Sequence, residues 1–201
     1  MSTDTELRIP TQARGTKRVE SILDAAAALV MEVGVEGVTA QVLADRAATS
    51  KGSLYHFFPD IPSVLRALAD RHLEEIGAIM ETRRSDASLR WGAMSPAEVV
   101  SHVLAPLDYL ERNCDLLALV RAPGVMPRSA RSMQPMVDYV DFVLGARFPE
   151  MDAERRAARA STLVSVIDGI VGSSARGCAR GSRGMRRELE ELLTVYVGSL
   201  G

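Results

Sequence analysis

The chain has 201 residues, which is enough for one large domain or two small ones with a buried core. Hydrophobic residues make up 47% of it but aromatic residues only 4%, a balance that favours helices over sheets and predicts a nearly all-α fold. The formal net charge of −2 excludes a general attraction to polyanions, so nucleic-acid binding would need charge arranged on one face.

Several classes of site are not indicated by the sequence. Cys114 and Cys178 do not have the spacing of metal ligands, and we expect both to be reduced thiols. No apolar run approaches the roughly 20 residues that span a bilayer, and Met1 to Gln12 lacks a signal-peptide core. We therefore expect a cytoplasmic protein with no membrane association, no metal and no cofactor.

The first predicted element after residues 1–15 is a helix. Residues 1–15 mix Thr, Pro, Gly and charged residues without periodicity and are predicted to be a flexible arm. Apolar residues then recur at helical spacing from Thr16, a possible N-cap, to Gly34, which can end the helix in a left-handed conformation. Lys17 and Arg18 in its first turn suit phosphate contact, although solvated side chains would give the same pattern.

Two short helices joined by a tight turn are predicted over residues 39–58. Thr39 caps the first, residues 40–47, whose Val42, Leu43 and Ala47 are expected to face inward. After a turn at Ala48 and Thr49, Ser50 caps the second helix. Its predicted buried face is Leu54 with Phe57 or Phe58.

The outward face of the second of these helices has the chemistry of a DNA-reading surface. Gly52 and Ser53 add little bulk, so the helix can approach base edges, while Lys51 can reach a guanine or a phosphate. Tyr55 can hydrogen-bond a phosphate and so fix the register on the duplex. The candidate DNA contacts are Lys17, Arg18, Thr39, Gln41, Thr49, Ser50, Lys51, Gly52, Ser53, Tyr55 and His56.

In these residues the chain resembles the TetR/AcrR family of transcriptional regulators over roughly residues 17–66. The matching positions are Ile22, Leu23, Asp24, Ala25, Ala26, Gly34, Thr39, Leu43, Ala44, Ala47, Ser50, Lys51, Gly52, Ser53, Leu54, Tyr55, Phe58 and Leu65. The resemblance implies an amino-terminal three-helix head with a helix-turn-helix DNA-binding domain over residues 16–60. It also implies that residues 61–201 form a larger helical effector-binding and dimerisation domain.

The chain departs from the family pattern at four positions. Ala48 stands where the family usually has glycine, and in a left-handed conformation it should cost about 1 kcal/mol. Phe57 and Ile61 stand where the family commonly has a histidine and a lysine that contact phosphate, and Val30 replaces an aromatic residue.

The remaining sequence predicts further helices. Asp60 caps one that runs to about Met80, with His72 in a solvated polar run and an apolar set at Val64, Leu65, Leu68, Leu73, Ile76 and Ile79. Ser95 caps another, which should kink or break at Pro106. Further helices are predicted after a turn at Asn113 and over residues 129–144, 152–176 and 186–200.

The last two predicted helices each carry an apolar stripe. The stripes could pack within one chain, or they could pair with a second copy in a four-helix bundle. The resemblance favours a homodimer through the last two helices, because a dimer can bind the two half-sites of a palindromic double-stranded DNA operator.

The middle of the chain is rich in methionine and amphipathic aromatic residues, which could line an effector pocket or simply form core. If a pocket exists, it suits an apolar or amphipathic small molecule whose identity the sequence does not specify. The candidate effector-binding residues are Trp91, His102, Tyr109, Arg121, Met126, Met133 and Tyr139.

Catalysis is not indicated, because His56, His72 and His102 are the only histidines and no nucleophile elbow, paired metal-ligand motif or phosphate loop occurs. We expect a ligand-responsive DNA-binding regulator, most often a repressor in such families, that binds as a dimer and is released by its effector. The alternative is a helical protein-interaction or architectural module whose DNA-reading head is weakened or lost. The absence of the expected phosphate contacts at Phe57 and Ile61 makes it the runner-up.

Overall fold

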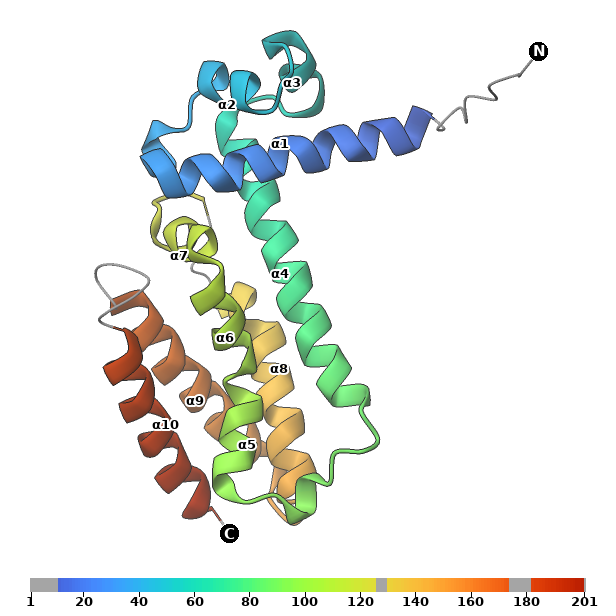
Figure 1. The fold of residues 1–201 in the computed structure, drawn as a ribbon. Coiled ribbons are helices and arrows are strands. Elements are labelled where there is room, and N and C mark those ends of the chain that lie inside the picture. The colour runs from blue at the N-terminus through green and yellow to red at the C-terminus, as the bar shows by residue number, and fades with distance from the viewer. Residues whose placement is uncertain (1–10, 126–129, 174–181, 201) are drawn as a thin grey trace, which may run out of the picture. The chain divides into compact units, whose positions relative to one another are not determined.

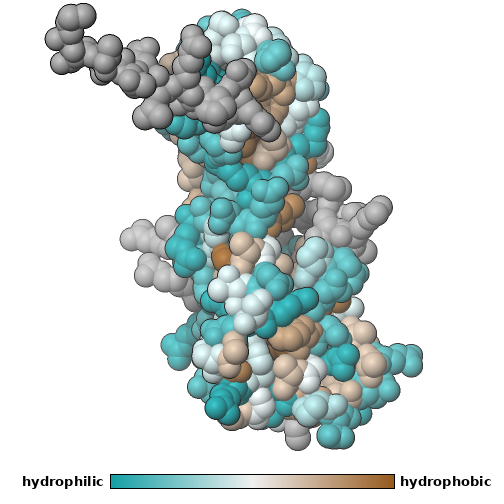
Figure 2. Space-filling view, turned by 90° about the vertical axis from the view of Figure 1, so that its right-hand side faces the viewer, coloured by the Kyte–Doolittle hydropathy of each residue, from teal (hydrophilic) through white to brown (hydrophobic). Residues whose placement is uncertain are grey.

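The computed structural model describes residues 11–125, 130–173 and 182–200. These residues form helices, and no strand occurs among them, which confirms the predicted all-α fold (Figure 1). The chain divides into two compact units, Met1–Asp70 and Arg71–Gly201. The division lies inside helix α4 (Ile61–Ser85), whereas the domain boundary predicted from the sequence lies between residues 60 and 61. The face drawn in Figure 2 is mostly hydrophilic, with hydrophobic residues in small separate areas.

Helix α1 (Thr11–Val33) begins earlier than predicted. Residues 11–15, assigned to the arm, are helical, and Thr16 lies inside the helix instead of capping it. A single glycine at position 15 costs only about 1 kcal/mol in a helix, which the buried face that follows can offset. The helix ends as predicted at Gly34, whose φ is 75° and whose N–H donates to the Val30 carbonyl at 3.1 Å. Residues 1–10 lie outside the described residues.

A short 3-10 helix, η1 (Val35–Gly37), leads to α2 (Ala40–Arg46) and α3 (Lys51–Phe57), and the side-chain caps predicted for both α-helices are confirmed. The Val42 N–H donates to Thr39 Oγ1 at 3.4 Å, and the Ser53 N–H donates to Ser50 Oγ at 3.1 Å. These bonds satisfy backbone donors that a helix leaves unpaired at its first turn. The chain therefore fixes where both helices begin.

Burial in α2 and α3 follows a narrow stripe. Leu43, Ala47 and Leu54 are buried as expected, and Phe58 rather than Phe57 completes the buried face of α3. The prediction that Val42 faces inward is wrong, because its side chain is 40% exposed. A helix of seven residues can bury only one stripe, and in α2 the positions around Leu43 and Ala47 occupy it.

The turn between α2 and α3 is a Schellman motif built on an alanine. The Thr49 N–H donates to the Ala44 carbonyl at 2.9 Å, and the Ala48 N–H donates to the Asp45 carbonyl at 3.2 Å. Ala48 has a φ of 48°, which makes it the one non-glycine residue with positive φ in the described part of the chain. The left-handed conformation considered for this position is therefore present, and it favours glycine.

The second unit contains the rest of the helices. Asp60 caps α4 as predicted, because its Oδ1 accepts from the Ser63 N–H at 2.7 Å. Predicted boundaries at Pro106 and Asn113 are confirmed, since each lies where one helix ends and the next begins. The elements after α4 are η2 (Trp91–Ala93), α5 (Pro96–Val103), α6 (Ala105–Arg112), α7 (Cys114–Arg121), α8 (Ala130–Arg147), α9 (Ala153–Ser173) and α10 (Ser182–Gly198).

One core holds the second unit together. It is formed mainly by α5, α8, α9 and α10, and α9 and α10 lie side by side in opposite directions (Figure 1). Its fully buried side chains include Val99, Leu104, Tyr139, Val140, Val143, Leu144, Ala160, Leu189 and Leu193. In the described part of the chain, no helix is long and apolar enough to cross a membrane.

Two sequence expectations in this unit are wrong. His72, placed on a solvated face, is only 5% exposed, whereas Leu73 is 39% exposed. The buried stripe of α4 passes through Leu68, His72 and Met80 at helical spacing, so the histidine takes the place expected for the leucine. The expectation that Cys114 is a reduced thiol is wrong as well, since Cys114 is disulfide-bonded. Sequence spacing alone does not reveal which cysteines lie close together in space. Cys178 lies outside the described residues.

The turn generates a stability prediction. Ala48→Gly should raise the free energy of unfolding by about 0.5–1 kcal/mol, because it removes left-handed strain that exceeds the added flexibility of the unfolded chain. Urea denaturation followed by circular dichroism measures this change. As a control, Ala78→Gly in the exposed middle of α4 should lower it by about 1 kcal/mol. A comparable loss of unfolding free energy in both variants would contradict strain at Ala48.

Candidate nucleic-acid interface

One side of α3 is presented outward because the other side is buried. Leu54 is 1% exposed and Phe58 9% exposed, so these two side chains fix the rotation of α3 within the head. Lys51, Gly52, Tyr55 and His56 are consequently exposed, and the Tyr55 side chain is 50% exposed. Ser53 is half-buried. The structure thus places four of the predicted contact residues of α3 on one accessible edge.

Gly52 is not required by the internal packing of the head. A Cβ atom at this position would meet only Ser50 Oγ, at 3.9 Å, which is an ordinary contact. Its φ is not in the left-handed region either, so alanine would fit the free protein. The fold does not need a glycine here. Because Gly52 has no side chain, a second molecule can approach the backbone of α3 closely at its first turn.

Predicted contacts on α2 and the turn are less available. Thr39 is exposed but its hydroxyl oxygen caps α2, and Thr49 is half-buried. The Gln41 amide nitrogen donates to both carboxylate oxygens of Asp45 at 2.9 Å. Gln41 would have to leave Asp45 before its N–H groups could bind a phosphate.

An ion pair that was not predicted from the sequence joins α1 to α2. Arg46 Nη1 donates to Glu32 Oε1 at 2.8 Å, and Nη2 donates to Oε2, which gives a two-pronged pair. The hydrogen bond from Arg46 lowers the pKa of Glu32, and the same bond raises the pKa of Arg46. Both side chains are exposed, so water screens the pair and its contribution to stability is small. Its effect is to hold Arg46 within the head.

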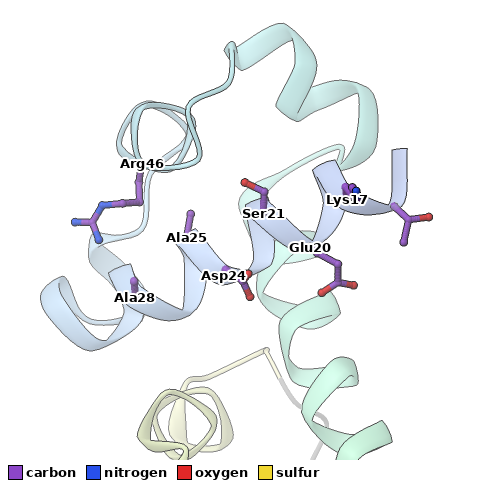
Figure 3. Close-up of a pocket in the computed structure, with 8 residues that line it drawn as sticks. Lys17, Glu20, Ser21, Asp24, Ala25, Ala28 and Arg46 are labelled. Atoms are coloured by element: carbon purple, nitrogen blue, oxygen red, sulfur yellow. The ribbon is translucent and has the colours of Figure 1, made fainter. Parts of the chain in front are cut away.

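Lys17 and Arg18, the predicted contacts of α1, are both exposed, and Lys17 borders a groove of about 500 Å³ between α1 and Arg46 (Figure 3). The groove is lined by Thr16, Lys17, Glu20, Ser21, Asp24, Ala25, Ala28 and Arg46. Glu20 and Asp24 bring negative charge to the same surface as Lys17. This face of α1 is therefore mixed in charge and does not form a basic patch.

Three of the predicted effector residues lie together in the second unit. The Trp91 ring centroid is 5.0 Å from that of His102, and the Tyr139 hydroxyl donates to the His102 carbonyl at 3.1 Å. Trp91 and Tyr139 are buried in the core, and burial raises the pKa of Tyr139 to about 12. Burial, followed by the charge of Arg83, lowers the pKa of His102. His102 is half-buried.

The other predicted effector residues lie elsewhere or are not described. Tyr109 contacts His72, Arg121 is half-buried on α7, and Met133 packs against the core cluster. Met126 lies outside the described residues. Within the described ranges, no group of three or more His, Cys, Asp or Glu side chains could hold a metal ion.

Comparisons with known proteins agree with this geometry. A sequence profile for bacterial regulatory proteins of the tetR family matches residues 22–68, which contain α2, the turn and α3. No curated protein matches the chain. A TetR-family transcriptional regulator of known structure from Streptomyces coelicolor is 27% identical, with a TM-score of 0.64 over 92% of this chain and 98% of that one.

Two further solved structures share the fold at lower identity. The fatty acid degradation regulator FadR from Bacillus halodurans is 16% identical, with a TM-score of 0.65 over 88% of this chain and 94% of that one. A TetR transcriptional regulator from Legionella pneumophila is 18% identical, with a TM-score of 0.64 over 94% of this chain and 99% of that one. Residues 22–68 therefore match the tetR family of bacterial regulatory proteins, and the helical fold with its helix-turn-helix head is similar to that of TetR-family transcriptional regulators of known structure.

Proposed function

We propose that the protein is a ligand-responsive repressor that binds a palindromic DNA operator as a homodimer and leaves it when a small molecule binds. The observation that carries this proposal is the outward edge of α3, where Lys51, Gly52, Tyr55 and His56 are exposed while Leu54 holds the opposite side in the core. A slim edge with a cation and hydrogen-bonding groups suits the major groove of duplex DNA.

The charge of the head argues for specific contacts made by two heads together. Residues 1–60 contain the basic residues Arg8, Arg14, Lys17, Arg18, Arg46 and Lys51 and the acidic residues Asp4, Glu6, Glu20, Asp24, Glu32, Glu36, Asp45 and Asp60. Arg46 is already paired with Glu32. A single head therefore has little general attraction for phosphate, and linking two heads would raise affinity without any new type of contact.

The surface of α9 and α10 supports the proposed homodimer. Leu192 is 55% exposed and Val195 is 74% exposed on α10, although both are large apolar side chains. They border a groove of about 310 Å³ lined by Thr162, Leu163, Val166, Leu192, Leu193, Val195, Tyr196 and Ser199. On α9, exposed Ser161, Thr162 and Ser165 are small enough to allow a partner helix to approach closely. A second copy would bury this apolar face in a four-helix bundle.

The effector is proposed to be an apolar or amphipathic small molecule bound in the second unit. The interior of this unit is largely apolar, with His102 and Tyr109 as half-buried polar groups, and a structural neighbour is a fatty acid degradation regulator. Release requires only that the molecule prefer the form of the dimer that cannot bind DNA. Each 1.4 kcal/mol of preference shifts that equilibrium tenfold.

A glycine substitution tests close approach of α3 to DNA. Gly52→Ala should leave the fold intact and stabilise it by about 0.5 kcal/mol, yet weaken operator binding at least about tenfold, because the added methyl group would meet the DNA. Mobility-shift titration with an operator found by in vitro selection measures the affinity. Gly77→Ala in α4, where a Cβ atom would meet nothing within 4 Å, is the matched control and should leave binding unchanged. Equal operator affinities for the wild type and both variants would show that α3 does not lie in the DNA interface.

Salt dependence tests the role of Lys51. Log affinity for the operator should fall linearly with log salt concentration, and Lys51→Ala should reduce that slope by about 2 for the dimer, because about one fewer counterion is released at each of the two heads. Lys51→Arg should retain the slope. If the wild-type protein bound no duplex with a salt-dependent affinity, the alternative of a protein-interaction module would be favoured.

The dimer can be tested at its most exposed apolar residue. Val195→Glu should weaken self-association at least about tenfold, since a charge at the centre of an interface would be buried unpaired. Analytical ultracentrifugation across a concentration series measures the change. Met31→Glu, at a side chain in the head that is 55% exposed, provides a control of the same chemistry. Unaltered self-association in Val195→Glu, or an equal loss in both variants, would exclude the α9–α10 face.

A further inference from the structure

A buried hydrogen-bonded cluster in the second unit joins three helices. His72 of α4 uses both ring nitrogens: Nδ1 is 2.8 Å from the Tyr109 hydroxyl of α6, and Nε2 is 2.8 Å from Asp115 Oδ2 of α7. His72 and Asp115 are the two buried polar or charged residues in the described part of the chain, at 5% and 8% exposure. The Tyr109 ring also contacts the His72 ring edge-on, with centroids 5.8 Å apart.

The charge state of Asp115 defines the direction of the bond to His72 Nε2. Burial alone would raise the pKa of Asp115, but the hydrogen bond and charge of His72, together with backbone N–H groups at the start of α7, lower it overall. An ionised carboxylate only accepts, so His72 Nε2–H must donate to it. The other bond depends on the ring: Nδ1 accepts from the Tyr109 hydroxyl when the ring is neutral and donates to it when the ring is protonated. Arg71 and Glu75 also act on Tyr109, so the cluster lies among charges of both signs.

The cluster lies where α4 passes from one compact unit to the other. Helix α4 is continuous from Ile61 to Ser85, and the division between the units falls between Asp70 and Arg71. Between residues 71 and 85, only His72 and Met80 are buried. Apolar contacts are non-directional, whereas hydrogen bonds depend on distance and angle. The bonds of His72 can therefore fix the rotation and position of α4 at a point where few apolar contacts would do so.

We propose that His72, Tyr109 and Asp115 are positioning residues that form a latch on α4, and that this latch sets the spacing between the two DNA-reading heads of the dimer. This inference rests on the proposed function. With the latch closed, α4 leaves the second unit in one defined direction, so both heads match only one operator spacing. With the latch open, α4 has several positions, and the dimer loses preference between spacings while each head keeps its own contacts.

The experiment compares two duplexes and one half-site. An operator obtained by in vitro selection is titrated beside the same operator with one extra central base pair, and beside a single half-site. The double variant His72→Leu with Asp115→Asn removes the latch without leaving an unpaired buried charge, and its asparagine can still accept from the backbone at the start of α7. Arg156→Leu with Asp141→Asn is the matched control, because that pair joins α8 to α9 at 3.0 Å and does not involve α4.

Loss of the latch should reduce the preference for correct over lengthened spacing about tenfold, with half-site affinity unchanged. A merely structural role would lower affinity for all three duplexes together. Tyr109→Phe retains the His72–Asp115 pair and serves if the double variant does not fold; it should reduce the same preference about threefold. The control should behave as wild type.

The outcomes separate the two proposals. The latch proposal is overturned, and the proposed function stands, if the latch variants distinguish the two spacings as well as wild type does. The same conclusion follows if the control variant loses as much of this preference as the latch variants do. If wild type binds the half-site but shows no preference between the spacings, the spacing of the heads is not fixed, and the latch proposal is also overturned. If wild type binds none of the duplexes, the proposed function and the latch that rests on it are both overturned.

Discussion

The burial of Leu54 governs the chemistry of the head. Because this side chain is 1% exposed, the rotation of α3 is fixed, and the polar residues on its opposite side face outward. The capping bonds of Thr39 and Ser50 fix where α2 and α3 begin, and the Schellman turn at Ala48 fixes the angle between them. Each of these constraints acts over a few residues, so a short segment can hold a precise surface without a large core of its own.

Local constraints are also what could be predicted from the sequence. Thr39, Ser50 and Asp60 cap their helices as expected because a side-chain cap requires only a partner three residues away. Val42 was misassigned because periodicity does not define the edge of a buried stripe in a helix of two turns. The early start of α1 has a related cause, since nothing between residues 11 and 15 is strong enough to stop a helix that the following turns stabilise.

Long-range partners could not be predicted. His72 lies in a polar run, and its burial depends on Tyr109 and Asp115, which are 37 and 43 residues away in sequence. Its spacing from Leu68 and Met80 was a signal, but a histidine on an apolar stripe is interpretable only once its partners are known. The same applies to Arg46, whose partner Glu32 lies 14 residues earlier on another helix. Trp91 and Tyr139 have the composition of a pocket wall, and their burial in the core comes from packing that no local pattern encodes.

The shortness of α3 limits how much sequence a single head can discriminate. Seven residues span about 10 Å along the helix axis, which corresponds to roughly three base pairs of duplex. Three base pairs have only 64 combinations, whereas a genome offers about a million or more competing sites. Selective binding to one site in a genome therefore requires several such helices to contact the DNA together. The spacing between those helices then contributes to sequence specificity as well.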